Sequence, residues 1–209
     1  MNTADKMHAK ALQDALLALD PAGPDGFEGF LGVILGEITG QSFRLAKSGT
    51  QRGRDGDSAF DGGATYFEGK RYKDGLSKND ITIKLFDVAN DDASLVDLWI
   101  LGATCEVASQ TVDDGRAFAA KHGFGIAVLD WSNNDFGSLL VAAVAAGAKS
   151  KTFIAQGLTG RPGAALVTPA ANAIDHFANH GDFPFRASAL RSALAEDVGL
   201  GNAKTLNQE

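Results

Sequence analysis

The spacing of the apolar residues alternates between a helical and a strand-like period along residues 25–148, and this alternation strongly restricts the possible fold. The segments predicted in this part of the chain are, in order, a helix over 25–39, strands over 42–46 and 64–72, a helix over 77–90, a strand within 95–107, a helix over 111–122, a strand over 125–130 and a helix over 135–148. Two early strands, followed by helical crossovers to two further strands, predict an α/β fold with a mixed central sheet flanked by helices.

The chain divides into a predicted core with a helical segment on either side. With 209 residues, of which 44% are hydrophobic, it is long and apolar enough for one globular domain. Residues 1–24 are predicted to form a helix and a linker, and residues 25–148 the core. Residues 149–209 are expected to add a mostly helical C-terminal extension. Within the core, the glycine-rich stretch 48–63 is predicted as a loop.

The composition excludes several classes of protein. The longest apolar run, residues 139–148, is about half as long as a membrane span. The charged residues within the first turns of the chain are incompatible with a secretory signal sequence. The single cysteine, Cys105, excludes an internal disulfide framework and a multi-cysteine zinc site. We therefore expect a soluble, cytoplasmic protein that does not engage a membrane.

Charge is distributed unevenly along the sequence. The net charge of −7 argues against a protein that coats nucleic acid through bulk electrostatics. Between Arg44 and Lys84, however, nine Lys or Arg residues outnumber six Asp or Glu residues, which leaves this segment at +3 and the remainder of the chain at −10. A local basic patch is typical of a protein that contacts a polyanion at one place, and an ordinary solvated surface explains the charge equally well.

The stretch 48–72 contains the residues best suited to catalysis. Because side chains alternate along a strand, Glu68 and Lys70 are predicted to share one face. Asp55, in the predicted loop, can bring a second carboxylate beside Glu68. Two carboxylates and a lysine are the minimal set for phosphodiester hydrolysis, because hard oxygens bind Mg²⁺ or Mn²⁺ and a cation positions the attacking water. We expect Asp55, Glu68 and the Gly69 carbonyl to bind the metal ion.

Three short motifs, in this order, resemble the PD-(D/E)xK nuclease superfamily, which has the restriction-endonuclease-like fold. The motifs are Phe27-Glu28-Gly29-Phe30 in the first core helix, Gly53-Arg54-Asp55-Gly56 in the loop and Glu68-Gly69-Lys70 in the strand. The resemblance covers residues 27–131, about half of the chain. It implies that Asp55 and Glu68 are metal ligands. By the same resemblance, Lys70 is the cation that positions the attacking water, and Glu28 is an accessory catalytic carboxylate.

A finer resemblance is to the N-terminal nuclease effector modules of bacterial STAND-type antiphage defence proteins, in which a nuclease precedes an NTPase switch and a sensor. It depends on the motif at residues 27–30 together with Ser48-Gly-Thr-Gln-Arg-Gly-Arg-Asp55-Gly56. This resemblance implies a Mg²⁺-dependent endodeoxyribonuclease that acts as a cytoplasmic effector. The implied partners are double-stranded DNA and either further copies of the chain or a larger NTPase and sensor portion of a parent protein.

Basic residues near the predicted site are expected to contact DNA phosphates rather than bases. They are Arg52, Arg54, Arg71 and Lys73. Because the whole chain is acidic, tight binding to DNA is expected to require self-association, which would also supply one active site for each strand.

Other residues compete for the same roles. Asp57 and Asp61 lie close enough in the sequence to Asp55 to replace it as a ligand. Glu37 competes with Glu28, but a separation of nine residues places the two about 180° apart on a helix, so both cannot face one site. We favour Glu28 because it matches the motif. Each carboxylate also has a structural interpretation, as a turn residue, a surface ion-pair partner or a charge at a helix N-terminus.

Two other classes of function compete with the nuclease hypothesis. A nuclease-fold protein that has lost catalysis and only binds DNA or a partner is the main alternative, although all three charged positions are present. An α/β small-molecule hydrolase or a protein-interaction module is the other, and no Gly-x-Ser-x-Gly elbow supports the hydrolase. His176 and His180 have the spacing of zinc ligands on a helix, but without an evident third ligand we interpret them as an ordinary helix surface.

Overall fold

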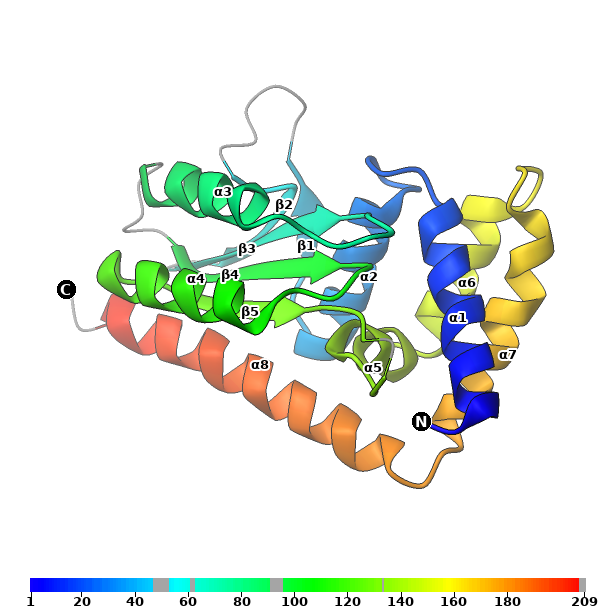
Figure 1. Cartoon of the computed structure of the whole chain (residues 1–209). Helices are drawn as coiled ribbons and strands as arrows, with labels where there is room; N and C mark the ends of the chain where they lie inside the picture. The colour runs from blue at the N-terminus through cyan, green and yellow to red at the C-terminus, as the bar shows by residue number, and fades with distance from the viewer. Residues whose placement is uncertain (47–52, 61–62, 91–95, 133, 207–209) are drawn as a thin grey trace.

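A mixed sheet forms the centre of the computed structural model (Figure 1). The structure describes residues 1–46, 53–60, 63–90, 96–132 and 134–206. Within these residues the strands, in their order across the sheet, are β1 (Phe43–Leu45), β2 (Gly56–Phe60), β3 (Gly63–Lys70), β4 (Val96–Ala103) and β5 (Gly125–Leu129). β1, β2 and β3 pair antiparallel, whereas β3, β4 and β5 pair parallel. The predicted α/β fold with a mixed sheet is therefore confirmed.

Helices cover both faces of the sheet. The described α-helices are α1 (Thr3–Ala18), α2 (Phe27–Thr39), α3 (Lys78–Asn90), α4 (Ser109–Lys121), α5 (Ser138–Ala145), α6 (Ala148–Leu158), α7 (Val167–Ala178) and α8 (Phe183–Leu206), with a short 3₁₀ helix, η2 (Ala164–Leu166), before α7. α3 and α4, which connect the parallel strands, pack on one face. α2, α5 and α8 pack on the other face, and α1, α6 and α7 lie beyond them (Figure 1). The region from α5 to α8 is helical, as predicted.

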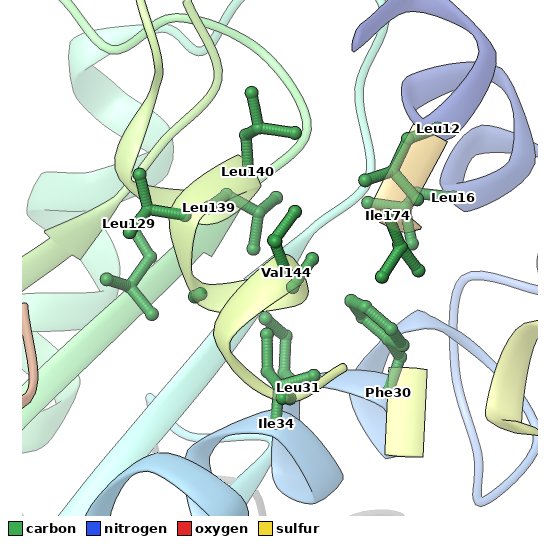
Figure 2. Packing of buried hydrophobic residues seen from close by; sticks show 14 of the residues in the cluster. Leu12, Leu16, Phe30, Leu31, Ile34, Leu129, Leu139, Leu140, Val144 and Ile174 are labelled. Carbon is green, nitrogen blue, oxygen red and sulfur yellow. The ribbon is translucent and has the colours of Figure 1, made fainter. Parts of the chain in front are cut away.

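The larger hydrophobic cluster joins the sheet to helices from both ends of the chain. The whole apolar stripe predicted on residues 25–39 is buried in it, namely Phe27, Phe30, Leu31, Ile34, Leu35 and Ile38. Figure 2 shows Leu31 beside Val144 of α5, and Leu12 of α1 close to Ile174 of α7. The first helix and the C-terminal helices therefore complete the same core as the sheet.

A second cluster lies between the sheet and the helices α3 and α4. Because side chains alternate along β3, Phe67 points into the larger cluster, whereas Tyr66 packs in this second one with Trp99 of β4. Glu68 and Lys70 follow Tyr66 at two-residue intervals and share its face of β3. Glu68 and Lys70 therefore lie on one face of β3, as strand alternation predicts. This is the face that α3 covers.

The strands differ from the prediction at two points. β2 lies inside the stretch 48–63 that was predicted as a loop. It begins with Gly56, Asp57 and Ser58, so it lacks the apolar alternation by which strands are recognised. β3 ends at Lys70 rather than at Tyr72, which is 43% exposed and therefore does not continue the strand face that carries Glu68.

The helix predicted over 135–148 is wrong in its extent, because the structure contains two helices in this region. α5 ends at Ala145 and α6 begins at Ala148, on either side of Gly147. Gly147 has φ of 46°, a conformation that glycine adopts more readily than other residues. Among the described helices none is by itself long and apolar enough to cross a bilayer; α5 and α6 reach that length only in combination, and they are bent by 97° where they meet.

Gly56, the first residue of β2, is expected to tolerate no side chain. A Cβ atom at this position would lie 2.3 Å from Cε1 of Phe67 and 2.6 Å from the carbonyl oxygen of Arg44. Because the Phe67 ring is fully buried and the other atom belongs to the backbone, neither moves easily. Gly56→Ala should therefore lower the free energy of unfolding by about 1–3 kcal/mol, measured by urea denaturation.

Gly181→Ala is the matched control for this substitution. A Cβ atom at Gly181 would have no atom within 4 Å, and the residue does not need a positive φ. This variant should change the free energy of unfolding by less than about 0.5 kcal/mol. Equal stability of the two variants would contradict the close packing of β2 on β3.

Candidate functional site

The antiparallel pairing of β2 with β3 brings Asp55 and Glu68 together. Gly56 pairs with Phe67, and the Asp55 N–H donates a hydrogen bond to the Phe67 carbonyl at 2.8 Å. This bond goes to the residue that already pairs with Gly56, so it holds Asp55 at the end of the ladder, beside the residue that precedes Glu68. A flexible loop was expected to bring the two carboxylates together. The structure corrects this point, because a backbone hydrogen bond to β3 fixes Asp55.

The Asp55 carboxyl group is buried at the end of this ladder. The residue is only 5% exposed, and its Oδ2 accepts a hydrogen bond from the Gly69 N–H at 2.7 Å. Burial and the negative charge of Glu68 raise the pKa of Asp55 to about 7, against the opposing effects of the Gly69 hydrogen bond and the positive charge of Lys70. Asp55 therefore changes its protonation state close to neutral pH.

Glu68 is almost completely buried, and two lysines approach the same one of its oxygens. The residue is 1% exposed. Lys70 Nζ donates to Oε1 at 2.6 Å, and Lys84 Nζ lies 3.1 Å from the same atom. The other oxygen, Oε2, is buried and has no hydrogen-bond partner within the described residues. A buried carboxylate oxygen without a partner is costly, so Oε2 marks a position where a cation or a donor fits.

Lys70 keeps its positive charge in spite of its burial. Burial by itself lowers the pKa of an amine, but the negative charges of Glu68 and Asp55 outweigh this effect, and the pKa of Lys70 lies above its ordinary value. Lys70 is also the last residue of β3, where its carbonyl accepts a hydrogen bond from the Thr104 N–H at 3.1 Å. The ammonium group is therefore held, fully charged, beside two carboxylates.

Lys84 is a residue of the site that the sequence analysis did not select. It belongs to α3, where it lies next to Leu85 in the buried stripe of that helix. Its side chain is 24% exposed, compared with 15% for Lys70. In the sequence, Lys84 stands beside the buried stripe of the helix that follows β3. This pattern does not predict which strand residue the lysine contacts.

α3 also holds the backbone that leads to Asp55. A Cβ atom at Gly53 would lie 2.4 Å from the carbonyl oxygen of Lys84 and 2.7 Å from Cγ2 of Val88, and Gly53 has φ of 78°. The Gly53 carbonyl accepts a hydrogen bond from Nε1 of Trp99 at 3.0 Å. Only glycine combines this positive φ with this close approach, which explains why a glycine stands at position 53 of the Gly53-Arg54-Asp55 motif.

Glu28 lies within electrostatic range of the same site. Its Oε2 accepts a hydrogen bond from the Gly23 N–H at 3.1 Å. Burial raises the pKa of Glu28, the Gly23 hydrogen bond lowers it, and the charge of Glu68 raises it further. Glu37 is exposed and lines a different hollow, of about 420 Å³, between α2 and β1. The two glutamates therefore do not face one site, as the helical geometry predicted.

Asp57, one of the two rival aspartates, is engaged by arginine side chains. Asp57 Oδ1 accepts a hydrogen bond from Arg44 Nε at 2.6 Å, and its Oδ2 lies 3.3 Å from Arg54 Nε. The Arg54 guanidinium is in turn stacked on Tyr66, 4.0 Å from the ring centroid. Asp57 is therefore engaged by two arginines, and Asp61 lies outside the described residues.

The basic residues expected to contact DNA have different surroundings. Arg54 is held by the contacts just described, and Arg71 donates a hydrogen bond to the Leu17 carbonyl near the end of α1. Lys73 is exposed beyond the end of β3, and Arg52 lies outside the described residues. Lys73 is thus the one described residue of the four whose side chain is open to solvent.

The site offers two carboxylates to a metal ion. In the described part of the chain, no group of three or more His, Cys, Asp or Glu side chains is placed to hold one ion. Mg²⁺ is commonly bound by one or two carboxylates, with water and substrate phosphates completing its coordination. Asp55 and Glu68, with the unpartnered Oε2 and the adjacent Gly69 peptide, fit this mode of binding.

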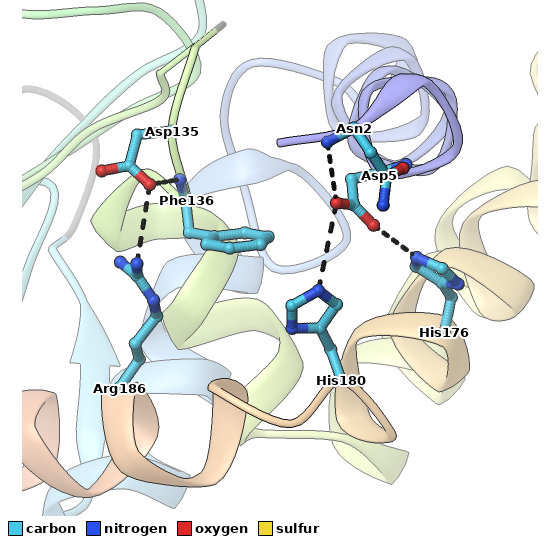
Figure 3. A network of polar contacts seen from close by, with 7 residues as sticks. All are labelled: Asn2, Asp5, Asp135, Phe136, His176, His180 and Arg186. Atoms are coloured by element: carbon cyan, nitrogen blue, oxygen red, sulfur yellow. Dashed lines mark hydrogen bonds and ion pairs between the residues drawn. The ribbon is translucent and has the colours of Figure 1, made fainter.

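The histidines that sequence analysis assigned to a helix surface instead join two helices (Figure 3). His176 Nε2 of α7 lies 2.9 Å from Oδ1 of Asp5, and His180 Nε2 lies 3.9 Å from Oδ2. Asp5 is buried, and the hydrogen bond with His176 lowers its pKa. The ring of His8 stacks on His176 with centroids 4.1 Å apart. The interpretation as an ordinary surface therefore missed their contacts with Asp5 of α1, although both side chains stay partly exposed, at 30% and 28%.

Comparison with known proteins identifies no relative. No protein-family model matches the chain, and no curated protein or solved structure is significantly similar to it. The class that the structure defines is an α/β fold whose described residues form a five-strand mixed sheet, flanked by helices and followed by a helical C-terminal region.

The protonation of Asp55 should make stability depend on pH. Between about pH 4 and pH 7 the folded protein retains a proton on Asp55 that the unfolded chain releases. The free energy of unfolding should therefore fall as the pH rises through this range, and Asp55→Asn should remove that part of the decrease. Urea denaturation at half-unit intervals between pH 4.5 and pH 8 measures both slopes.

Asp175→Asn is the control for the loss of a carboxylate. Asp175 forms an exposed ion pair with Lys151 at 2.7 Å. Its substitution should leave the pH dependence of wild type unchanged. If Asp55→Asn had the same slope as wild type, Asp55 would not carry the raised pKa.

Proposed function

We propose that this chain is a metal-dependent endonuclease that hydrolyses phosphodiester bonds in DNA. The observation that carries the proposal is the pair Asp55 and Glu68, buried side by side, with a lysine on Oε1 of Glu68 and no partner on Oε2. Two buried carboxylates repel each other, so a stable fold has little reason to place them together unless they share a proton or a cation. A divalent ion on hard oxygens meets that requirement.

The order of the elements supports a PD-(D/E)xK nuclease of the restriction-endonuclease-like fold. α2 carries Glu28, the hairpin of β2 and β3 carries Asp55, Glu68 and Lys70, and α3, β4, α4 and β5 follow in sequence. This is the order that the motif resemblance implies. The cluster of these four side chains gathers the motif residues from three separate segments of the chain.

In this proposal Asp55, Glu68 and the Gly69 carbonyl hold Mg²⁺ or Mn²⁺. When bound, the ion acts as a Lewis acid on the phosphate and lowers the pKa of water. Hydrolysis forms a P–O bond from the attacking water and breaks one P–O ester bond, while the water loses a proton to solvent and the leaving oxygen gains one. Lys70 orients the water and stabilises the negative charge that develops on it. Asp55 must lose its proton to serve as a ligand.

The proposed biological role is that of a cytoplasmic effector in a prokaryotic antiphage defence system. Its support is the resemblance of the motif at residues 48–56 to the nuclease modules of STAND-type defence proteins. The proposed substrate is double-stranded DNA, with Arg52, Arg54, Arg71 and Lys73 as phosphate contacts. Because the chain carries a net charge of −7, we propose that it acts as a homo-oligomer or joined to an NTPase and sensor portion.

A catalytically inactive DNA- or partner-binding module is the second candidate. The observation that favours it is that two ammonium groups already neutralise Glu68, and that the described residues include no group of three or more metal-ligand side chains. Such a module would keep the fold and the ion pairs but would not hydrolyse DNA. The following two experiments separate it from the nuclease.

Lys70→Ala should abolish most cleavage and leave metal binding nearly intact, because Lys70 acts on the water and is not a metal ligand. A loss of about 10²–10³-fold is expected in plasmid nicking with Mg²⁺ or Mn²⁺. Lys78→Ala, which removes an exposed lysine paired with Asp114, should cleave like wild type. Full activity in Lys70→Ala would contradict the mechanism, and a wild type that does not nick plasmid with either ion would favour the inactive module.

Metal affinity should depend on pH because the ion competes with the proton on Asp55. With a pKa of about 7, Asp55 is mostly protonated at pH 6 and mostly ionised at pH 8. The apparent affinity for Mn²⁺ should therefore be about tenfold higher at pH 8, measured by electron paramagnetic resonance of the free ion. Asp55→Asn should bind weakly at both pH values. Equal affinity of wild type at pH 6 and pH 8 would exclude Asp55 as a ligand.

A further inference from the structure

Lys84 is bound to Glu68 in a way that a purely stabilising ion pair does not require. Lys70 Nζ and Lys84 Nζ lie 2.6 Å and 3.1 Å from Oε1, whereas Oε2 of the same carboxylate has no hydrogen-bond partner among the residues that the structure describes. Two ammonium groups that only neutralised a buried carboxylate would gain more by dividing between its two oxygens. The second lysine therefore has positive charge to offer to another anion.

The charge of the proposed site points to the same conclusion. Asp55 and Glu68 together neutralise a divalent ion, and Lys70 then faces the negative charge that develops on the attacking water. A phosphodiester brings one further negative charge to this place. Glu28 offsets part of the positive charge, since it lies within electrostatic range of both lysines. Among the described residues, Lys84 is the other cation paired with Glu68.

The position of Lys84 places it on the outer side of the cluster. Exposure of the side chain rises from 1% for Glu68 to 15% for Lys70 and 24% for Lys84. Lys70 extends from the end of β3, whereas Lys84 reaches the same oxygen from α3, which covers this face of the sheet. Lys84 is therefore the more solvent-accessible of the two lysines that contact Glu68.

We infer that Lys84 is a second substrate-binding cation of the site and donates a hydrogen bond to a non-bridging oxygen of the scissile phosphodiester. The inference rests on the proposed nuclease function. The two lysines then have different roles: Lys70 orients the attacking water, and Lys84 binds the phosphate. In this role Lys84 binds and orients the phosphate and takes part in no proton transfer.

The test uses a short DNA duplex and the variants Lys84→Met, Lys84→Arg and Lys78→Met. Lys78 is the matched control, because it lies on the same helix and is 61% exposed in a pair with Asp114. Affinity is measured by fluorescence anisotropy in Ca²⁺, which we expect to support binding but little cleavage. Cleavage is measured under single-turnover conditions in Mn²⁺ on duplexes in which sulfur replaces one non-bridging oxygen, in either configuration, at a mapped cleavage position.

Lys84→Met should bind the duplex about threefold to tenfold more weakly and cleave it about 10–100-fold more slowly. In wild type, sulfur in one configuration should slow cleavage more than sulfur in the other, because sulfur is a poor hydrogen-bond acceptor. This difference should nearly disappear in Lys84→Met and persist in Lys70→Ala. Lys84→Arg should retain most of the affinity, and Lys78→Met should behave like wild type.

The outcomes distinguish the inference from the proposed function. If wild type cleaves the duplex but shows no difference between the sulfur configurations, or if Lys84→Met keeps the difference and the affinity of wild type, the role of Lys84 is overturned and the nuclease stands. If wild type does not cleave in Mg²⁺ or Mn²⁺, the proposed function falls and the inference falls with it. If Lys84→Met does not fold, Lys84→Gln, which can still donate to Glu68, replaces it in the same assays.

Discussion

The repulsion between Asp55 and Glu68 is the constraint on which the arrangement of this molecule depends. A backbone hydrogen bond at the end of the β2–β3 ladder holds Asp55 near Glu68, and both residues are buried, so water does little to screen their charges. Two features compensate for this cost: a proton on Asp55 at acidic pH, and the ammonium groups of two lysines on Glu68. α3 supplies one of these lysines and also holds Gly53, so the helix that balances the charge also positions the backbone before Asp55.

The sequence predicted the parts of the fold that apolar periodicity specifies. The stripe on α2, the buried strand β4 and the partly buried strand β5 are recognisable because their apolar residues are close together in the sequence. β2 was missed because Gly56, Asp57 and Ser58 form a strand only through pairing with β3, which is a non-local interaction. The single helix predicted over 135–148 failed at Gly147, where the sequence shows only one glycine in an Ala-rich run.

Prediction of the site succeeded for contacts within one strand and failed for contacts between elements. Glu68 and Lys70 are two residues apart, so strand alternation alone places them together. Lys84 reaches Glu68 only because α3 packs over β3 in one particular orientation, and periodicity does not specify that orientation. His176 is a similar case: its partner, Asp5, is 171 residues away in the sequence, and only the packing of α7 on α1 brings them together.

α1 is fixed at both ends, and this has a mechanical consequence. Near its start, Asp5 is bound to His176 of α7; near its end, the Leu17 carbonyl is bound to Arg71, the residue that follows Lys70. A helix with rigid internal hydrogen bonding transmits a displacement along its axis with little loss. α1 therefore acts as a strut between the C-terminal helices and the end of the strand that carries Glu68 and Lys70. A displacement of α7 would therefore reach that end of the strand through α1, which also packs in the larger hydrophobic cluster.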